Sequence, residues 1–189
     1  MTDAVVLSFG VIFVAELGDK SQLMALAFAA RYKPWPILAG ITVATAVVHL
    51  FSVLAGGLLG TALPTAAINV VAGVAFLAFA AWTLRGDSLD DDEAARAHRT
   101  TRSAFVAVAV AFFLAELGDK TMLATVTLAT RESLFGTWLG STVGMVAADA
   151  LAIVVGSLLG KRLPERAIRY GAAASFVVFG LLLIVEGLR

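Results

Sequence analysis

The sequence contains no cysteine, and its 189 residues include only two histidines, four methionines and four prolines. The absence of cysteine excludes disulfide bonds, thiolate metal sites and thiol nucleophiles. Copper(I) prefers sulfur ligands and zinc usually takes more imidazole than two histidines supply, so both metals are disfavoured. Charge is also scarce, at 15% of residues, and acidic and basic residues are equal at 14 each. No excess of either sign therefore suggests a nucleic-acid partner.

Apolar residues are abundant, at 60% of the chain, and the mean hydropathy is +0.92. Soluble domains are nearer half apolar and about a quarter charged, so part of the surface is expected to face lipid. A membrane span needs about 20 apolar residues, and six stretches qualify: about 4–30, 37–59, 66–85, 103–130, 136–159 and 165–187. The N-terminus lacks the basic segment of a signal peptide, so the first stretch is expected to remain as a span.

The two halves of the chain repeat each other at an offset of 100 residues without a gap. The segment Ala15 to Lys20 recurs as Ala115 to Lys120, and further identities continue along both halves, such as Gly40 with Gly140 and Leu63-Pro64 with Leu163-Pro164. The pattern predicts a tandem duplication, with a three-helix repeat at 1–85, a polar linker at 86–102 and a second three-helix repeat at 103–189. The predicted fold class is an all-α integral membrane protein of six transmembrane helices. Because three spans is an odd number, the two repeats should have inverted topology, as in many secondary transporters.

The basic residues predict how the chain is oriented in the membrane. Twelve of them flank the predicted spans, ten on one side and two (Arg131 and Arg189) on the other; the ten are Arg31, Lys33, Arg85, Arg96, Arg99, Arg102, Lys161, Arg162, Arg166 and Arg169. The central linker is therefore expected in the cytoplasm and both termini outside. The acidic run Asp90 to Glu93 within this linker is expected to be solvated.

Each repeat carries one charged motif inside an otherwise apolar stretch: Glu16-Leu17-Gly18-Asp19-Lys20-Ser21 and Glu116-Leu117-Gly118-Asp119-Lys120-Thr121. The largely apolar segment from Ala4 to Ala15 rises roughly 18 Å as a helix, which places the first motif near the bilayer centre. Ionisable groups at this depth are costly and usually functional. On a continuous helix Glu16 and Asp19 would share one face, and Lys20 would pair with Glu16. Gly18 and Gly118 mark the points where the helices could loosen.

Together the two motifs would hold four acidic and two basic side chains, a net charge of −2 that one divalent cation or two protons would neutralise. Oxygen ligands of this kind suit Mg²⁺, Ca²⁺ and Mn²⁺. The predicted metal ligands are Glu16, Asp19, Glu116 and Asp119. An auxiliary or proton-coupling role is predicted for their neighbours and for one matched pair in the second spans: Lys20, Lys120, Ser21, Thr121, Gln22, His49 and Asp149. A purely structural role for the lysines, for His49 and for Asp149 stays open.

The paired pattern E-x-G-D-[KR]-[ST] resembles the signature of a family of small cation/proton antiporters within the lysine-exporter superfamily. That family contains bacterial manganese exporters and the manganese/calcium transporters of the Golgi and chloroplast. The resemblance covers nearly the whole chain and implies exchange of Mn²⁺ or Ca²⁺ for protons at the four motif acids, by alternating access. A chain without a targeting extension resembles the bacterial exporters in particular, which implies manganese and the bacterial inner membrane. Expected partners are the cation, protons and lipid; no cofactor is expected, and a homodimer is left open.

Three other functions fit less well. Intramembrane aspartyl proteases pair a G-x-G-D segment with a Tyr-Asp segment, and this chain has neither, so an enzyme is not expected. A structural role for the motif acids would leave two of the four without a lysine. Export of an amino acid, as in the lysine exporters, is the alternative and predicts a wider cavity with less concentrated acidity.

Overall fold

The computed structural model describes residues 1–85, 103–159 and 165–189, and within these it is entirely helical. The first half contains α1 (Thr2–Glu16), α2 (Lys20–Ala29), α3 (Pro34–Ala62) and α4 (Thr65–Arg85). The second contains α6 (Ala104–Glu116), α7 (Lys120–Ala129), α8 (Leu134–Leu159) and α9 (Glu165–Gly187). The predicted linker, with its acidic run Asp90 to Glu93, lies outside the described residues.

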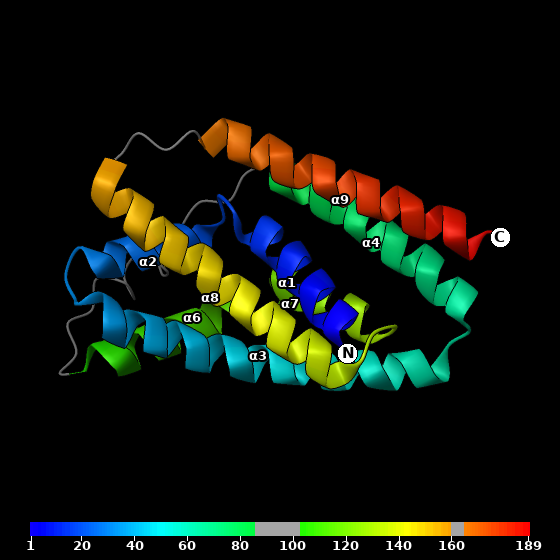
Figure 1. Ribbon diagram of the computed structural model, residues 1–189, viewed down its shortest axis with the longest axis horizontal. Coiled ribbons are helices and arrows are strands. Elements are labelled where there is room, and N and C mark those ends of the chain that lie inside the picture. The colour runs from blue at the N-terminus through cyan, green and yellow to red at the C-terminus, as the bar shows by residue number, and fades with distance from the viewer. Residues whose placement is uncertain (86–102, 160–164) are drawn as a thin grey trace.

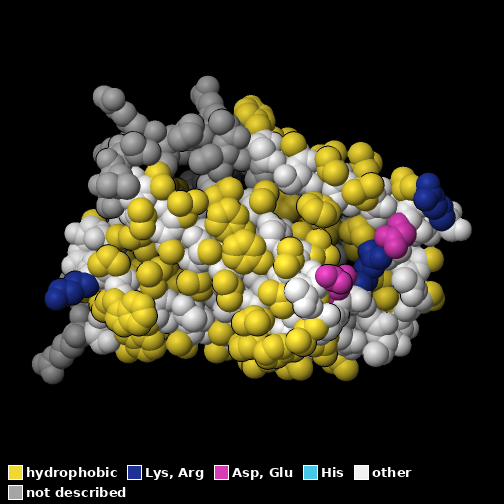
Figure 2. Space-filling view, viewed as in Figure 1, with side chains coloured by type: hydrophobic (Ala, Val, Ile, Leu, Met, Phe, Trp, Pro, Cys, Tyr) yellow, Lys and Arg dark blue, Asp and Glu magenta, His cyan; other side chains and the backbone are white. Residues whose placement is uncertain are grey.

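Three of these helices are long and apolar enough to cross a bilayer, judged by length and composition within the described residues: α3, α4 and the Leu134–Val155 part of α8. Shorter apolar helices are Ala104–Glu116 and Ala173–Gly187. The broad apolar surface in Figure 2, with charged side chains near its two ends, agrees with a membrane protein. Exposed Leu54, Val74 and Val154 contribute to such surface, which in water would be a liability and in lipid is not.

The first and fourth predicted spans differ from a simple crossing because each is interrupted. Within 4–30, α1 ends at Glu16 and α2 begins at Lys20; within 103–130, α6 ends at Glu116 and α7 begins at Lys120. Gly18 and Gly118 lie at the interruptions with φ of 76° and 79°. This left-handed backbone is open to glycine and strained for other residues. The predicted loosening at these glycines is therefore a complete break.

The halves pack on each other in a matched way, with α1 against α8 and α3 against α6, α7 and α8 (Figure 1). Glycines allow the close approaches. A Cβ added to Gly40 would lie 2.9 Å from the Phe105 carbonyl oxygen, and one added to Gly140 would meet the carbonyl oxygen of Val5. Residues 5 and 105 are matched positions in the repeat. Small residues at 40 and 140 therefore serve the same contact in both halves.

The remaining two helices, α4 and α9, run side by side and pair mainly with each other (Figure 1). Gly73 and Gly180 face one another in this pair, each within reach of the other's carbonyl oxygen. The pair meets the rest of the bundle through a cluster of rings, Phe76, Phe79 and Phe176, that packs with α1, α7 and α8 residues. The two motif breaks thus lie in the body formed by the other six described helices.

Candidate functional site

At each helix break, the motif aspartate is the residue immediately before the next helix. Asp19 and Asp119 are the N-cap residues of α2 and α7, with extended backbone at φ −81° and −75°. The backbone amide of Asp19 donates to the carbonyl of Glu16 at 3.1 Å, and that of Asp119 to Glu116 at 3.2 Å. Each break therefore folds the motif into a tight turn between the glutamate and the aspartate.

The two motifs meet across the halves through their lysines. The Lys120 ammonium forms an ion pair with Asp19, and Lys20 Nζ lies 3.8 Å from Asp119 Oδ1. The expectation that Lys20 would pair with Glu16 on the same helix does not hold, because the helix ends between them. Each aspartate instead has its counter-charge from the other half, which ties the two breaks together.

The pairs differ in exposure. The side chains of Lys120 and Asp19 are 2% and 0% exposed, whereas that of Lys20 is 20% exposed and that of Asp119 is 2%. A charge pair without contact with water depends on its geometry far more than one beside water. The Lys120–Asp19 pair is therefore shielded from solvent, whereas the Lys20–Asp119 pair is partly exposed.

Glu16 and Glu116 are buried between these pairs. Neither oxygen of Glu16 has a hydrogen-bond partner among the described residues, and Glu116 accepts a bond from Thr121 Oγ1 at 2.9 Å. Glu116 influences Glu16 electrostatically, and Asp19 influences both glutamates. Buried carboxylates in this condition favour neutralisation by a bound cation or by protons.

The hydroxyl groups of the motifs do not repeat each other. Ser21 Oγ donates to Asp19 Oδ2 at 3.4 Å, while Thr121 donates to a glutamate. Thr125, one turn further along α7, donates to the Thr121 carbonyl at 2.8 Å. Both hydroxyl groups thus donate hydrogen bonds to acidic side chains of the motifs.

Gln22 joins the first break to α8. Its Oε1 accepts from the Gly18 amide at 2.9 Å, and its Nε2 donates to the Ala148 carbonyl at 3.0 Å. At the matched position, Met122 accepts from the Gly118 amide through its sulfur at 3.2 Å. The sequence analysis did not single out Met122. The offset of 100 residues was the signal that could have identified it, because it aligns Met122 with Gln22.

His49 and Asp149 are both fully buried, on α3 and α8. Within the described part of the chain, no ring nitrogen of His49 and no carboxylate oxygen of Asp149 has a hydrogen-bond partner. One turn before them, the matched residues Thr45 and Met145 touch, with Thr45 Oγ1 donating to the Met145 sulfur at 3.2 Å. Helices α3 and α8 therefore contact each other one turn before these two residues.

Among the residues that the structure describes, no three acidic or histidine side chains converge as a metal-binding group. The lysine pairs explain this arrangement, because each ammonium lies where a cation would otherwise meet an aspartate. Capture of a cation by these acids requires side-chain movement within the site.

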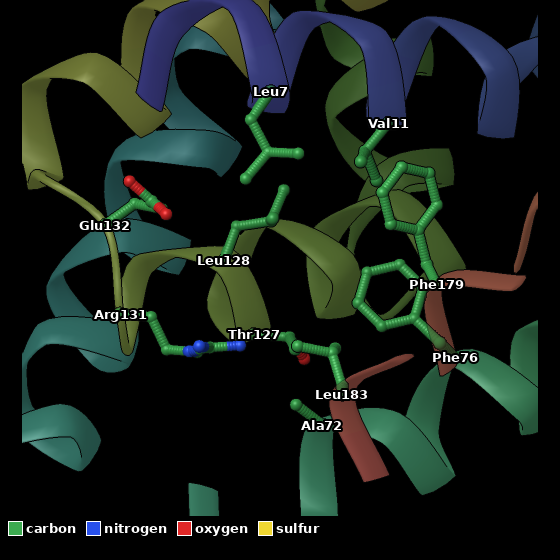
Figure 3. Close-up of a pocket in the computed structure, with 10 residues that line it drawn as sticks. All are labelled: Leu7, Val11, Ala72, Phe76, Thr127, Leu128, Arg131, Glu132, Phe179 and Leu183. Carbon is green, nitrogen blue, oxygen red and sulfur yellow. The ribbon is translucent and has the colours of Figure 1, made fainter. Parts of the chain in front are cut away.

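The described cavities lie away from the acids. One of about 60 Å³ lies between α1, α4, α7 and α9, with Phe76, Phe179 and Leu128 among its walls and Arg131 at its side (Figure 3). Arg131 also pairs with Glu186 of α9 at 3.0 Å. A second cavity of about 360 Å³ lies between α2, α3 and α8 and is lined by apolar residues that include Ala150. No motif acid lines either cavity.

Comparison with known proteins supports a transport function. The family model described as "Divalent cation/proton antiporter GDT1" matches residues 4–91 and 104–189. A protein of Vibrio cholerae serotype O1 named "Putative manganese exporter" is 36% identical over 178 residues, covering 93% of this chain and 87% of the relative. The chloroplastic protein PAM71 of Arabidopsis thaliana is 29% identical over 211 residues, covering 95% of this chain and 56% of its own length. The GDT1-like protein sll0615 of Synechocystis is 29% identical, with 90% and 91% covered. No solved structure matches.

Proposed function

The chain belongs to the divalent cation/proton antiporter GDT1 family, whose members transport divalent cations, and from this premise we propose that it exports Mn²⁺ in exchange for protons. Manganese is preferred to calcium because a relative named for manganese export matches most of both chains. The observation that carries the proposal is the meeting of the two motifs. The lysine of each motif pairs with the aspartate of the other half, and the four motif acids are all buried.

The proposed cation site consists of Glu16, Asp19, Glu116 and Asp119. In the described arrangement Lys120 and Lys20 neutralise the aspartates. A divalent cation that reaches the glutamates competes with the ammonium groups for the aspartate oxygens, and the lysines withdraw. Counted together, the four acids and the two lysines carry a net charge of −2 before binding, which a divalent cation or two protons would neutralise. Two protons per cation is the stoichiometry that this charge balance favours.

We also propose that the two halves, 1–85 and 103–189, are inverted three-span repeats joined by the linker 86–102. Matched contacts at Gly40 and Gly140 support this arrangement. Movement of one half against the other around the fixed acids would expose the site alternately to the two sides of the membrane. The bias of basic residues favours a cytoplasmic linker with both termini outside. The inner membrane of a bacterium is the proposed location, and the number of chains in the working unit stays open.

The test is metal-driven proton flux in liposomes that contain the purified protein and a pH-sensitive dye. Mn²⁺, Ca²⁺ and Mg²⁺ are added separately, and Glu16→Gln and Glu116→Gln are compared with the native chain. We expect Mn²⁺ to drive proton flux and each variant to abolish it, because each removes one of the two glutamate charges at the centre. Glu132→Gln is the control, since this acid lies outside both motifs, and it should keep the flux.

Absence of flux with every metal, in protein shown to be folded by its thermal unfolding, would contradict cation/proton exchange. Amino-acid export would then be tested with radiolabelled lysine in the same liposomes. Flux with Ca²⁺ and none with Mn²⁺ would keep the antiporter and change its cargo.

A further inference from the structure

Asp149 lies outside both motifs and has no counterpart acid, since the matched residue is His49. Its side chain is 0% exposed, and neither carboxylate oxygen has a hydrogen-bond partner in the ranges that the structure describes. Such a group is expensive to bury unless something compensates its charge. A structural role would normally supply a donor, and among the described residues none bonds to it. A bound cation would compensate the charge of this buried carboxylate.

The backbone around Asp149 is fixed against the first motif. Gln22 holds the carbonyl of Ala148, the preceding residue, and with its other end holds the amide of Gly18. One turn earlier, Met145 packs in the same buried cluster as Ala15, which precedes Glu16, and Ala124 of α7. This part of α8 thus lies along both helix breaks.

The charges agree with this placement. The Asp149 carboxylate influences Glu16 and Glu116 electrostatically, and the Asp19 carboxylate influences Asp149 in the same way. Asp19 and Asp119 have lysine partners, whereas Glu16, Glu116 and Asp149 have no ion pair among the described contacts. These three buried carboxylates therefore influence one another electrostatically, and none has an ion pair among the described contacts.

We propose that Asp149 is a further ligand of the transported divalent cation, acting with Glu16 and Glu116 on the α8 side of the site. The proposal rests on the cation transport proposed above and names a ligand outside the two motifs. Asp149 adds a third carboxylate without a lysine partner to the two glutamates, and affinity in oxygen-ligand sites depends on the number of charged ligands.

The matched corner of the site lacks these features. His49 stands in place of the acid, and no carboxylate of the described residues acts on its imidazole. Met122 stands in place of Gln22, and a thioether has no hydrogen to donate to the α3 backbone. The proposed ligand outside the motifs therefore comes from α8 and has no equivalent on α3, although the two halves match in sequence.

The experiment measures Mn²⁺ affinity of purified protein from the loss of the electron paramagnetic resonance signal of free Mn²⁺. We expect Asp149→Asn to weaken binding by roughly tenfold or more, as expected for loss of one charged ligand, and Asp149→Glu to recover most of the affinity. His49→Gln, at the matched position without a carboxylate, should lose clearly less affinity than Asp149→Asn. Ser52→Ala is the matched control, because Ser52 is buried on α3 and the second half already has Ala152 there.

Native affinity in Asp149→Asn, or an equal loss in His49→Gln, would overturn the assignment. If the native protein neither binds Mn²⁺ nor exchanges it for protons, the proposed function fails; if it does both and Asp149→Asn binds equally well, only this inference fails. Should Asp149→Asn not yield folded protein, Asp149→Ala decides in the same way, because it removes the carboxylate without burying another polar group.

Discussion

Two lysines that occupy the same place in the same motif have different surroundings. Lys120 is buried against Asp19, while Lys20 keeps a fifth of its side chain exposed beside Asp119. Removing one partner of a buried pair leaves the other charge buried, whereas the loss of a partly hydrated pair is small. The two lysines should therefore contribute unequally to stability.

Lys120→Met is expected to destabilise the protein by roughly 3–5 kcal/mol, and Lys20→Met by about 1 kcal/mol or less. The measurement is thermal unfolding of the purified variants in one detergent. Adding Asp19→Asn to Lys120→Met removes the buried charge that remains and should restore much of the loss. Equal losses of stability for the two single variants would show that the buried Lys120–Asp19 pair contributes no more than the partly exposed Lys20–Asp119 pair.

The sequence predicted which residues of the site are buried acids, but it could not predict their partners. The spacing of Glu16 and Lys20 suggested a bond within one helix, and that expectation assumed that the helix continues. Gly18 turns the backbone by a left-handed conformation, which sends Lys20 toward Asp119 of the other half. A contact between residues about 100 positions apart depends on how the halves pack, and neither motif alone contains that information.

At the scale of the helices, the break is the feature that positions the site. It ends α1 and α6 at a glutamate and begins α2 and α7 after an aspartate. The space around Gly118 is open, since an added Cβ would meet nothing within 4 Å. Glycine is needed there for its backbone conformation alone, which gives a clean substitution.

Gly118→Ala should destabilise the protein by about 1–2 kcal/mol, the cost of left-handed backbone for an L-residue, and should reduce Mn²⁺-driven proton flux. Gly118→Asn should be tolerated better, because Asn adopts this conformation more readily. Gly10→Ala is the control: Gly10 has equally open space but lies inside α1, so alanine should be neutral or stabilise by about 0.5–1 kcal/mol. Thermal unfolding and flux are measured for all three. A loss in Gly10→Ala as large as in Gly118→Ala would rule out the conformational explanation.

Hydropathy predicted where the apolar helices lie more accurately than where they end. The stretches 37–59 and 66–85 fall within α3 and α4, because continuous apolar runs bounded by prolines are simple signals. The stretches 4–30 and 103–130 are apolar on both sides of the motif, so a window averages over the break and returns one span. The glycine was noted, but composition does not distinguish a loosened helix from two helices.

At the scale of the whole molecule, the connections lie at the two ends of the long axis. Figure 1 shows the α2–α3 connection at one end of the long axis, and the α7–α8 connection and both termini in the opposite half, with the C-terminus at that far end. Lys33 and Ser133 hold matched positions in these two connections and are both exposed. In a membrane crossed along that axis, matched residues would face opposite compartments.

Single-cysteine labelling tests this arrangement without background, because the native chain has no cysteine. In intact cells, a membrane-impermeant maleimide should label Ser133→Cys, and it should label Lys33→Cys only after the membrane is permeabilised. Labelling of both from one side would contradict the inverted repeat. Labelling with the two sides exchanged would keep the repeat and reverse the proposed orientation.

The contact between Thr45 and Met145 has a consequence for the ancestry of the chain. These residues hold the same position in the two halves and touch through a hydroxyl and a sulfur. In an ancestor made of two identical half-length chains, this position would have met its own copy, and every mutation there would have appeared on both sides at once. Fusion of two such copies would end that coupling, so that threonine could face methionine and one side could carry an aspartate where the other has histidine. A direction of transport can then be inherited in the side chains themselves, which two identical chains could not encode.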